Sequence, residues 1–520
     1  MAQAVNNDLE AIIARTALKY DLLPYESKPF AQSQPARLGG LARLFGLEAA
    51  PLDKARVLEL GCAAGGNIIP HAVRYPDAKF TGIDLARTQV AAGRARIERL
   101  GLKNIDIQCQ SFTEIGDELG EFDYIICHGV YSWVPDMVQE AIFKVIQARL
   151  SPVGVACVSY NVLPGWRMLQ PLRDAFMLEV PDSNDSRARV AQARELANFL
   201  KSASPDKGPY GDMLRSWADR LATLPEDYIA HEFLEECNSP TTVRNFAQSA
   251  AKYGLGFLGE CELSSMILDN YGAGIADKVR ERSDIDLVES EQIIDLLSGR
   301  TFRQTLLISQ ARMDKVNRAL TPDRLADLHY VLPAGTVVEE EGGSTVMTDP
   351  SGRKLTTTQA DVGKALKVMI ARLPASSCLA DLLLKKDDAV QTAMLDALLK
   401  MALMGMIHLS SEAIVCETKA GARPTASLLS RADAAAGADN TTNARHDNVG
   451  LDPVAKELLP FIDGTRNVAA LTALLEKATS EGRLNFAKDG QPVAGEALKK
   501  TIAEYVPNML IGIANAGLLE

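Results

Sequence analysis

The sequence has few aromatic residues, and its cysteines do not cluster. Aromatic side chains make up 6% of the 520 residues, and only three of them are tryptophans. The eight cysteines are scattered, without a C-x-x-C pair or the spacing that zinc sites use. Scattered thiols that stay reduced are typical of the cytoplasm. We therefore expect a cytoplasmic protein without a metal site.

Long hydrophobic runs and an excess of positive charge are also lacking. Residues 1–20 contain no basic segment followed by a continuous apolar stretch, so they do not resemble a secretory signal. The most apolar long window, residues 393–409, includes Asp396 and Lys400 and falls short of a membrane span. The net charge of −12 argues against a partner held through nucleic-acid phosphates. These features predict neither membrane insertion nor nucleic-acid binding.

From residue 56 onward, short apolar stretches alternate with helical patterns. The expected strands are residues 56–60, 79–85, 104–111, 122–129 and 153–160, and the expected helices are 65–75, 88–101 and 136–150. Strands that alternate with helices form right-handed βαβ units and a parallel sheet that helices cover on both faces. Such sheets bind their ligands at the carboxyl ends of the strands.

The chain is too long for a single core, and its composition changes along its length. We expect a core domain in residues 1–166 that includes an N-terminal arm, a helical insertion or regulatory region over 167–240, completion of the core over 241–312, a helical or winged-helix-like domain over 313–430, a linker over 431–450 and a C-terminal helical domain over 451–520. Small and polar residues in the fifth segment predict a flexible linker. We also expect the core to bind its ligand without the tail.

Residues 57–72 join an expected strand to a helix through a glycine-rich turn, and such a turn approaches a ligand. A phosphate-binding P-loop ends in Gly-Lys-Ser or Gly-Lys-Thr, but asparagine and isoleucine follow Gly66, which excludes that motif. The dinucleotide fingerprint G-x-G-x-x-G matches Gly61 and Gly66 but has Ala63 in place of its middle glycine. This replacement argues against NAD or FAD without excluding them.

Two acidic residues flank the turn. Glu59 precedes Gly61 by two residues, and Asp84 ends the next expected strand. A carboxylate at the end of that strand can accept hydrogen bonds from both hydroxyls of a ribose. The turn itself leads into a helix N-terminus, which suits the carboxylate of an amino acid. The pattern therefore allows a ribose-containing ligand that has no pyrophosphate.

The motifs ELGCAAGG, GID, CQSFTEI and FDYIICHG, followed by a strand that ends in SYN, occur in the order found in class I S-adenosylmethionine-dependent methyltransferases. The segments PYESKPF, CHGVYSWVP and SYNVLPGW resemble, more narrowly, bacterial methyltransferases that carry a methyltransferase regulatory domain. These include rickettsial enzymes that methylate lysines of outer-membrane proteins. The resemblance covers residues 1–312. It implies an α/β fold with a Rossmann-like seven-stranded methyltransferase sheet, a reversed last strand, a helical insertion and mostly helical, winged-helix-like C-terminal domains.

The resemblance also implies S-adenosylmethionine as the cofactor and assigns residues to it. The assigned positions are Glu59, Gly61, Cys62, Ala63 and Asn67 around the methionine portion, Asp84 and Leu85 at the ribose and adenine, Ser111 and Phe112 at the adenine, His128 and Gly129 beneath the sulfonium, and Tyr20 closing the pocket from the arm. Ala63 stands where methyltransferases commonly have a glycine.

Aromatic residues gather after the fourth and fifth expected strands, where ligand contacts belong. The candidates for contact with the methyl acceptor are Tyr131, Trp133, Tyr160, Asn161 and Trp166, together with Tyr25 on the arm. Aromatic faces can hold a sulfonium or an ammonium, although such rings can also cap the core beneath the loops. The arm could act as a lid over the donor or as a strut on the sheet. No Asn/Asp-Pro-Pro-aromatic signature follows the fourth strand, which weakens a DNA or glutamine acceptor.

We therefore predict an enzyme that transfers a methyl group from S-adenosylmethionine to an acceptor, with protein lysine as the favoured acceptor. A small-molecule O- or N-methyltransferase and a catalytically silent cofactor-binding scaffold remain alternatives. The helical tail would dock a protein substrate, which could be an outer-membrane or surface protein before its export. The chain could also form a homodimer.

Overall fold

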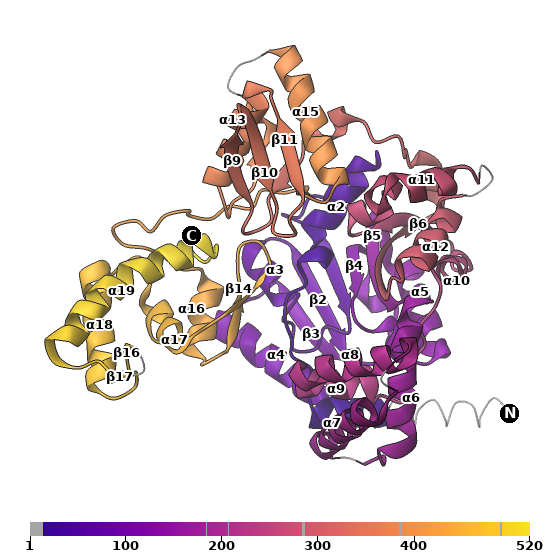
Figure 1. Cartoon of the computed structure of the whole chain (residues 1–520), viewed down its shortest axis with the longest axis horizontal. Helices are drawn as coiled ribbons and strands as arrows, with labels where there is room; N and C mark the ends of the chain where they lie inside the picture. The colour runs from indigo at the N-terminus through magenta and orange to yellow at the C-terminus, as the bar shows by residue number, and fades with distance from the viewer. Residues whose placement is uncertain (1–13, 184, 206, 283–285, 384–386, 489–490) are drawn as a thin grey trace.

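A seven-stranded sheet forms the centre of the protein (Figure 1). The computed structural model describes residues 14–520 except 184, 206, 283–285, 384–386 and 489–490. The strands are β1 (Arg56–Leu60), β2 (Lys79–Asp84), β3 (Ile105–Cys109), β4 (Phe122–Cys127), β5 (Leu150–Asn161), β6 (Leu255–Glu260) and β7 (Phe302–Ser309). Their order is β3-β2-β1-β4-β5-β7-β6. β7 is antiparallel to β5 and β6, and the other neighbours are parallel, which confirms the predicted sheet and its reversed strand.

Helices cover both faces of this sheet. The covering helices are α2 (Pro35–Leu44), α3 (Ile69–Arg74) and α4 (Arg87–Leu100) on one face, and α5 (Asp136–Arg149) and α10 (Val243–Ala251) on the other. Alternate residues of a strand point to opposite faces. In β1, Val57 therefore packs in the core with α2, while Leu58 packs in the core with α5. Burial on both faces explains why these strands are almost continuous apolar runs.

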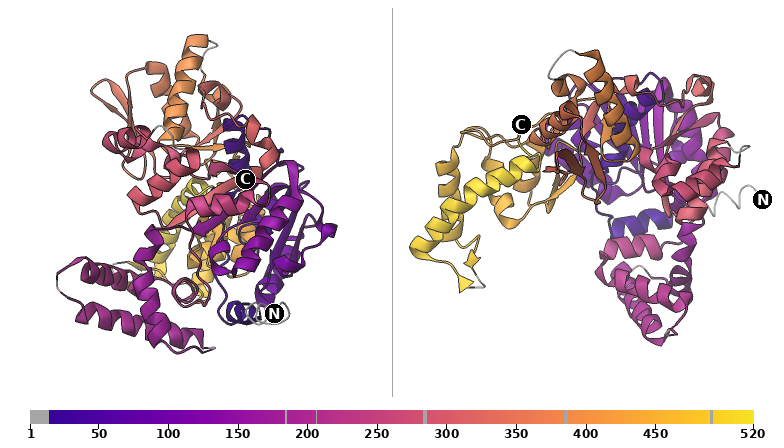
Figure 2. Two further views of the ribbon diagram at one scale, coloured as in Figure 1. Left: turned by 90° about the vertical axis from the view of Figure 1, so that its right-hand side faces the viewer. Right: turned by 45° about the horizontal axis from the view of Figure 1, so that its top comes forward.

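Four helices between β5 and α10 form the predicted helical insertion. They are α6 (Gln170–Glu179), α7 (Ser186–Ala203), α8 (Pro209–Thr223) and α9 (Glu226–Phe233). Each helix contributes apolar side chains to a separate core, among them Phe176, Val190, Leu214 and Phe233. The insertion projects from the sheet, away from the C-terminal helices (Figure 2). Because it has its own apolar core, the insertion is a distinct helical unit beside the sheet.

The connection from β6 to β7 includes α11 (Ala273–Arg280) and α12 (Leu287–Ser298). After β7, two small three-stranded sheets accompany the helices. Their strands are β8 (His329–Val331), β9 (Val337–Glu341), β10 (Ser344–Thr348), β11 (Lys354–Thr357), β12 (Ser377–Cys378) and β13 (His408–Ser410), and the helices are α13 (Ala360–Ala371), α14 (Leu379–Leu382) and α15 (Asp388–Leu403). Met347 and Leu398 belong to the same apolar core as Leu44 of α2. This region is therefore packed against the central sheet.

The C-terminal part begins with α16 and ends with the long α19. Its elements are α16 (Leu428–Ala435), β14 (Asn440–Thr442), β15 (Asn448–Gly450), α17 (Pro453–Leu458), α18 (Val468–Ser480), β16 (Ala487–Lys488), β17 (Gln491–Pro492) and α19 (Gly495–Asn515). The prediction of a flexible linker over residues 431–450 is wrong. Asp433 accepts hydrogen bonds from Arg96 and Thr441, and His446 is fully buried. The small residues of this segment permit close packing there.

In the described part of the chain, none of the helices combines the length and the apolar character needed to cross a membrane. The same residues contain no group of three or more histidine, cysteine, aspartate or glutamate side chains placed to hold a metal ion.

Candidate active site

A cavity of about 510 Å³ lies at the carboxyl ends of the central strands, between the sheet, the N-terminal arm and the insertion. Its volume is within the range of small-molecule sites, roughly 300–1,000 Å³. All twelve residues predicted to bind the cofactor line it: Tyr20, Glu59, Gly61, Cys62, Ala63, Asn67, Asp84, Leu85, Ser111, Phe112, His128 and Gly129. Four predicted acceptor contacts line it as well: Tyr25, Trp133, Asn161 and Trp166. The structure thus brings most of the predicted site together.

Asp84 holds the glycine-rich turn in shape. Its Oδ2 accepts a hydrogen bond from the Ala63 N–H at 2.8 Å, and its Oδ1 accepts one from the Ala86 N–H at 2.9 Å. Ala63 has a φ of +47°, in the left-handed region that favours glycine. Burial raises the pKa of Asp84, although the backbone hydrogen bonds oppose this shift. The hydrogen bond from Ala63 supports a conformation that alanine alone adopts unfavourably.

Glu59 presents a buried oxygen without a partner. Its Oε1 accepts a hydrogen bond from Asn67 Nδ2 at 2.8 Å, whereas Oε2 has no hydrogen-bond partner within the described residues. Burial raises the pKa of Glu59 to about 8, against the effect of the Asn67 hydrogen bond. A buried polar atom without a partner is costly. A hydrogen-bond donor on a ligand in this cavity would remove that cost.

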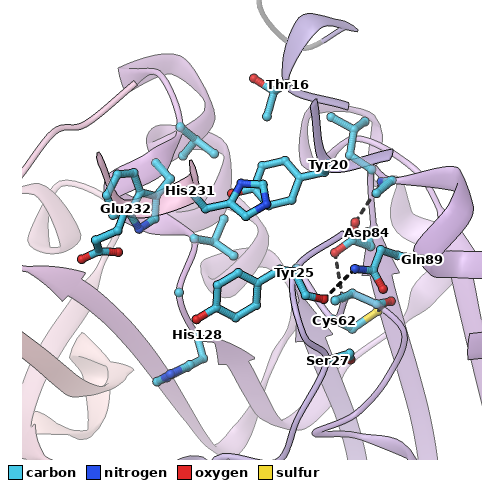
Figure 3. Close-up of a pocket in the computed structure, with 18 of the residues that line it drawn as sticks. Thr16, Tyr20, Tyr25, Ser27, Cys62, Asp84, Gln89, His128, His231 and Glu232 are labelled. Atoms are coloured by element: carbon cyan, nitrogen blue, oxygen red, sulfur yellow. Dashed lines mark hydrogen bonds between the residues drawn. The ribbon is translucent and has the colours of Figure 1, made fainter. Parts of the chain in front are cut away.

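The N-terminal arm lies directly on the glycine-rich turn. The Gly66 N–H donates to Ser27 Oγ at 2.8 Å, and the Phe30 N–H donates to Asn67 Oδ1 at 2.8 Å. A Cβ at Gly66 would lie 2.3 Å from the Ser27 backbone, so the close approach requires glycine. Tyr20, Tyr25 and Ser27 also form one side of the cavity (Figure 3). The arm therefore both braces the turn and covers the site.

All three tryptophans of the chain line this one cavity. The rings of Trp133 and Trp166 lie 5.9 Å apart and nearly perpendicular, and Trp166 Nε1 donates to Asn238 Oδ1 at 3.0 Å. Trp217 comes from α8 of the insertion, and the guanidinium of Arg220 lies 5.0 Å from the centre of its ring. We call the part of the cavity lined by Trp133, Trp166 and Trp217 the aromatic chamber.

The insertion supplies cavity residues that the sequence analysis missed: Trp217, Arg220, Tyr228, His231 and Glu232. His231 joins the insertion to the arm, because its Nε2 lies 2.8 Å from the Leu23 carbonyl oxygen and its ring stacks on Tyr20. The scarcity of tryptophan was the one available signal. Two of the three tryptophans were already candidates, so Trp217 could have been proposed on that ground alone.

The prediction that Tyr131 and Tyr160 contact the acceptor is wrong, because neither residue lines the cavity. Tyr160 stacks on Phe246 of α10, with ring centres 4.0 Å apart, and Tyr131 packs against the same ring. Both tyrosines belong to the core beneath α5 and α10. Consecutive residues of a strand point to opposite faces. Asn161 therefore faces the cavity while Tyr160 faces the core.

Comparison with known proteins identifies the family. Three family models match: a methyltransferase domain over residues 57–154, a predicted methyltransferase regulatory domain over 225–309, and the C-terminal winged helix domain of PKMT over 422–518. The Rickettsia prowazekii protein RP789 is 32% identical over 519 residues, which are 96% of this chain and 93% of that protein. The chain belongs to the class I S-adenosylmethionine-dependent methyltransferases with a regulatory domain. The regulatory-domain match includes β6 and β7, so it extends from the end of the insertion into the sheet.

Solved structures agree with this assignment. The structure of PKMT2 from Rickettsia typhi superimposes with a TM-score of 0.84 at 27% identity, over 95% of this methyltransferase and 100% of PKMT2. A second structure of PKMT2, in complex with AdoHcy, gives a TM-score of 0.83 at the same identity. A further Rickettsia prowazekii protein, RP028, is 36% identical over 236 residues, which are 45% of this chain and 94% of that protein. The methyltransferase domain and the AdoHcy bound in PKMT2 together identify S-adenosylmethionine as the cofactor of this methyltransferase.

The cavity fits this cofactor. Asp84 can accept from ribose hydroxyls, and the unpartnered Glu59 oxygen can accept from the amino group of the methionine portion. His128 is half-buried, and desolvation lowers its pKa to about 4, so its ring is neutral at neutral pH. A neutral ring places no positive charge beside a cationic sulfonium. The ring also packs 3.9 Å from Phe30 of the arm.

The C-terminal part reaches the cofactor motif through His446, which the sequence analysis also missed. His446 Nε2 lies 2.9 Å from Asn67 Oδ1, and the ring stacks on His71 with centres 4.0 Å apart. Burial lowers the pKa of His71 to about 3 and that of His446 well below its usual range. Asn67 Oδ1 only accepts, so the neutral His446 ring donates from Nε2. A histidine far along the chain thus orients the side chain that holds Glu59.

We expect His446→Ala to raise the Kd for S-adenosylmethionine by about 3- to 10-fold, the effect of losing one hydrogen bond of about 1 kcal/mol. Isothermal titration calorimetry measures this change. Asn448→Ala is the matched control, because Asn448 is exposed in the same segment and should leave the Kd unchanged. Equal affinities of the wild type and His446→Ala would show that His446 does not orient Asn67.

Proposed function

We propose that this methyltransferase transfers methyl groups to the side-chain amines of lysines in a protein acceptor. The aromatic chamber is the observation that carries the proposal, because three tryptophans gather beside the cofactor motifs in a chain with no others. Aromatic faces attract ammonium groups. The matching structure and the winged-helix family both carry the name PKMT, and the sequence motifs resemble those of bacterial enzymes that methylate protein lysines. An outer-membrane or surface protein, methylated before its export, is the acceptor to test first.

The residues of the site have separate roles in this proposal. Bound S-adenosylmethionine supplies a methyl carbon on a sulfonium, and the amine lone pair displaces the sulfur, which keeps the electrons of the broken C–S bond. Asp84 and Glu59 hold the donor, and the arm with Tyr20 and Tyr25 keeps water away. Trp133 and Trp166 orient the amine. Asn161 Nδ2, a buried donor without a partner in the described chain, can bind the acceptor.

Labelling tests the identity of the acceptor. The wild-type enzyme is incubated with S-adenosylmethionine labelled in its methyl group, together with a desalted cell extract or with poly-L-lysine, and the products are hydrolysed. We expect the label in N-methylated lysine. A catalytically silent scaffold would give no label in these mixtures or in an extract that has not been desalted. A small-molecule methyltransferase would give label only in the extract that has not been desalted, because that extract retains the metabolites. Either of these results would contradict the proposal, and Asp84→Ala provides the background.

A further inference from the structure

Glu232 of α9 is a carboxylate at the insertion side of the cavity, and none of the roles described above uses it. The side chain is half-buried, and no hydrogen bond or ion pair joins it to another residue in the described part of the chain. Figure 3 shows it on the side of Tyr25 that lies away from Asp84 and Cys62. Glu232 therefore belongs to the acceptor side of the cavity rather than to the cofactor motifs.

The groups that act on Glu232 come from the N-terminal arm and from the insertion. Tyr20 and Tyr25 approach from the arm, and Tyr228 lies on the same helix. Burial raises the pKa of all three tyrosines, so they stay neutral at neutral pH. Burial also raises the pKa of Glu232 to about 7, although the charge of Arg173 on α6 opposes this shift. The carboxylate thus sits among neutral aromatic groups, and Arg173 is the cation whose charge lowers its pKa.

The other charged groups on the insertion side are already engaged. The Arg173 guanidinium donates to the backbone carbonyl of Phe233, and Arg220 lies over the ring of Trp217. The two ring nitrogens of His231 lie 3.0 Å from Glu235 Oε1 and 2.8 Å from the Leu23 carbonyl oxygen. A cationic group entering the aromatic chamber would therefore meet Glu232 as its available anion.

Transfer to an amine requires a neutral nitrogen, because an ammonium has no lone pair. The base must lie in the cavity and hold a proton near neutral pH. Asp84 already accepts two backbone hydrogen bonds, and the low pKa of His128 makes it a weak base. Glu59 accepts a hydrogen bond from Asn67, and its other oxygen is already assigned to the amino group of the methionine portion. Glu232 alone combines the acceptor side of the cavity with a free carboxylate.

We propose that Glu232 binds the ammonium of the acceptor in the aromatic chamber and removes its proton before methyl transfer. One ammonium N–H bond breaks, and its proton joins a Glu232 carboxylate oxygen. This step leaves a neutral amine with a free lone pair and a neutral carboxyl group, which returns the proton to solvent after the product leaves. The inference rests on the proposed function, since it names the group through which an amine is selected.

Binding of a small amine tests this inference without turnover. The enzyme is saturated with S-adenosylhomocysteine, n-butylammonium or the neutral 1-pentanol is added, and tryptophan fluorescence is followed, because every tryptophan lines the cavity. We expect the wild type to prefer the ammonium by roughly 10-fold or more, as for a hydrogen bond between charged groups. Glu232→Gln should lose this preference and bind pentanol as before. Glu226→Gln, an exposed position on the same helix, should behave as the wild type.

The pH dependence gives a second readout. The ionised carboxylate attracts the ammonium, so the preference should be full above the Glu232 pKa of about 7 and fall as the pH decreases through it. With poly-L-lysine as acceptor, kcat/KM of the wild type should fall over the same range. In Glu232→Gln, kcat should be low and this limb of the profile absent.

The outcomes separate the inference from the proposed function. Equal preference for n-butylammonium in the wild type and Glu232→Gln, or an unchanged pH profile of kcat/KM, would overturn the role of Glu232 while leaving lysine methylation intact. Methylation of small amines without label in any protein lysine would refute the protein acceptor and keep the role of Glu232. A wild-type cavity that takes pentanol as well as n-butylammonium would refute the role of Glu232 directly.

Discussion

Replacing Asp84 with alanine is expected to weaken the binding of S-adenosylmethionine by about 2–4 kcal/mol, or roughly 30- to 1000-fold. The variant loses the carboxylate that can accept from the ribose hydroxyls. It also loses the oxygens that accept hydrogen bonds from the Ala63 and Ala86 N–H groups. The bond from Ala63 supports that residue at a φ of +47°. Isothermal titration calorimetry measures the affinity, and circular dichroism verifies that the sheet is retained.

Two variants control this experiment. Asp84→Asn keeps one amide oxygen and the size of the side chain, so it should lose less affinity than Asp84→Ala. Asp106→Ala removes an exposed carboxylate from the neighbouring strand β3 and should bind the cofactor as the wild type does. An unchanged affinity in Asp84→Ala would refute the assignment of Asp84 to the ribose.

Replacing Arg303 with alanine should destabilise the protein more than any surface substitution. Arg303 is completely buried on β7 and forms ion pairs with Glu260, Glu291 and Asp295. Burial raises the pKa of Glu291 to about 7 even beside this cation. Removal of the arginine leaves buried carboxylates uncompensated, a loss of about 3–5 kcal/mol. For a chain of 520 residues, we expect the melting midpoint to fall by roughly 3–5 °C, measured by differential scanning fluorimetry.

The matched control is Arg244→Ala. Arg244 of α10 pairs with Glu289 of α12, the helix that also carries Glu291 and Asp295. This pair is exposed, and exposed ion pairs contribute little to stability. Its melting midpoint should stay close to that of the wild type. The cluster around Arg303 matters for the site because Thr301 and Phe302, its neighbours in sequence, line the cavity. If Arg303→Ala melted like Arg244→Ala, the buried cluster would not hold this edge of the sheet.

Residues 313–520, which the sequence predicts to offer a docking surface, also contact the cofactor motif and the core of the sheet. His446 orients Asn67 at the cofactor motif, and Met347 and Leu398 share an apolar core with α2. A protein cut near residue 312 would expose that core and lose the His446 hydrogen bond. These contacts argue against cofactor binding by the core without its tail, which stays a prediction. Point variants are the better test of each part.

The sequence by itself determined the sheet and brought the residues predicted to bind the cofactor to one cavity. Each signal there is local, because a strand, a glycine-rich turn and an acid at the end of the next strand specify backbone conformation within a few residues. All twelve residues assigned to the cofactor line the cavity for this reason. The family resemblance supplied their roles, and the order of the motifs supplied the topology.

Only the tertiary structure decided the acceptor half. Side-chain direction along a strand placed Asn161 in the cavity and Tyr160 in the core, although both are polar residues at one strand end. Trp217 and Glu232 reach the cavity because four insertion helices pack on a separate core, and no local pattern specifies where such a unit docks. His446 contacts Asn67 across 379 residues of sequence. Contacts of this kind depend on long-range packing, which composition and periodicity do not encode.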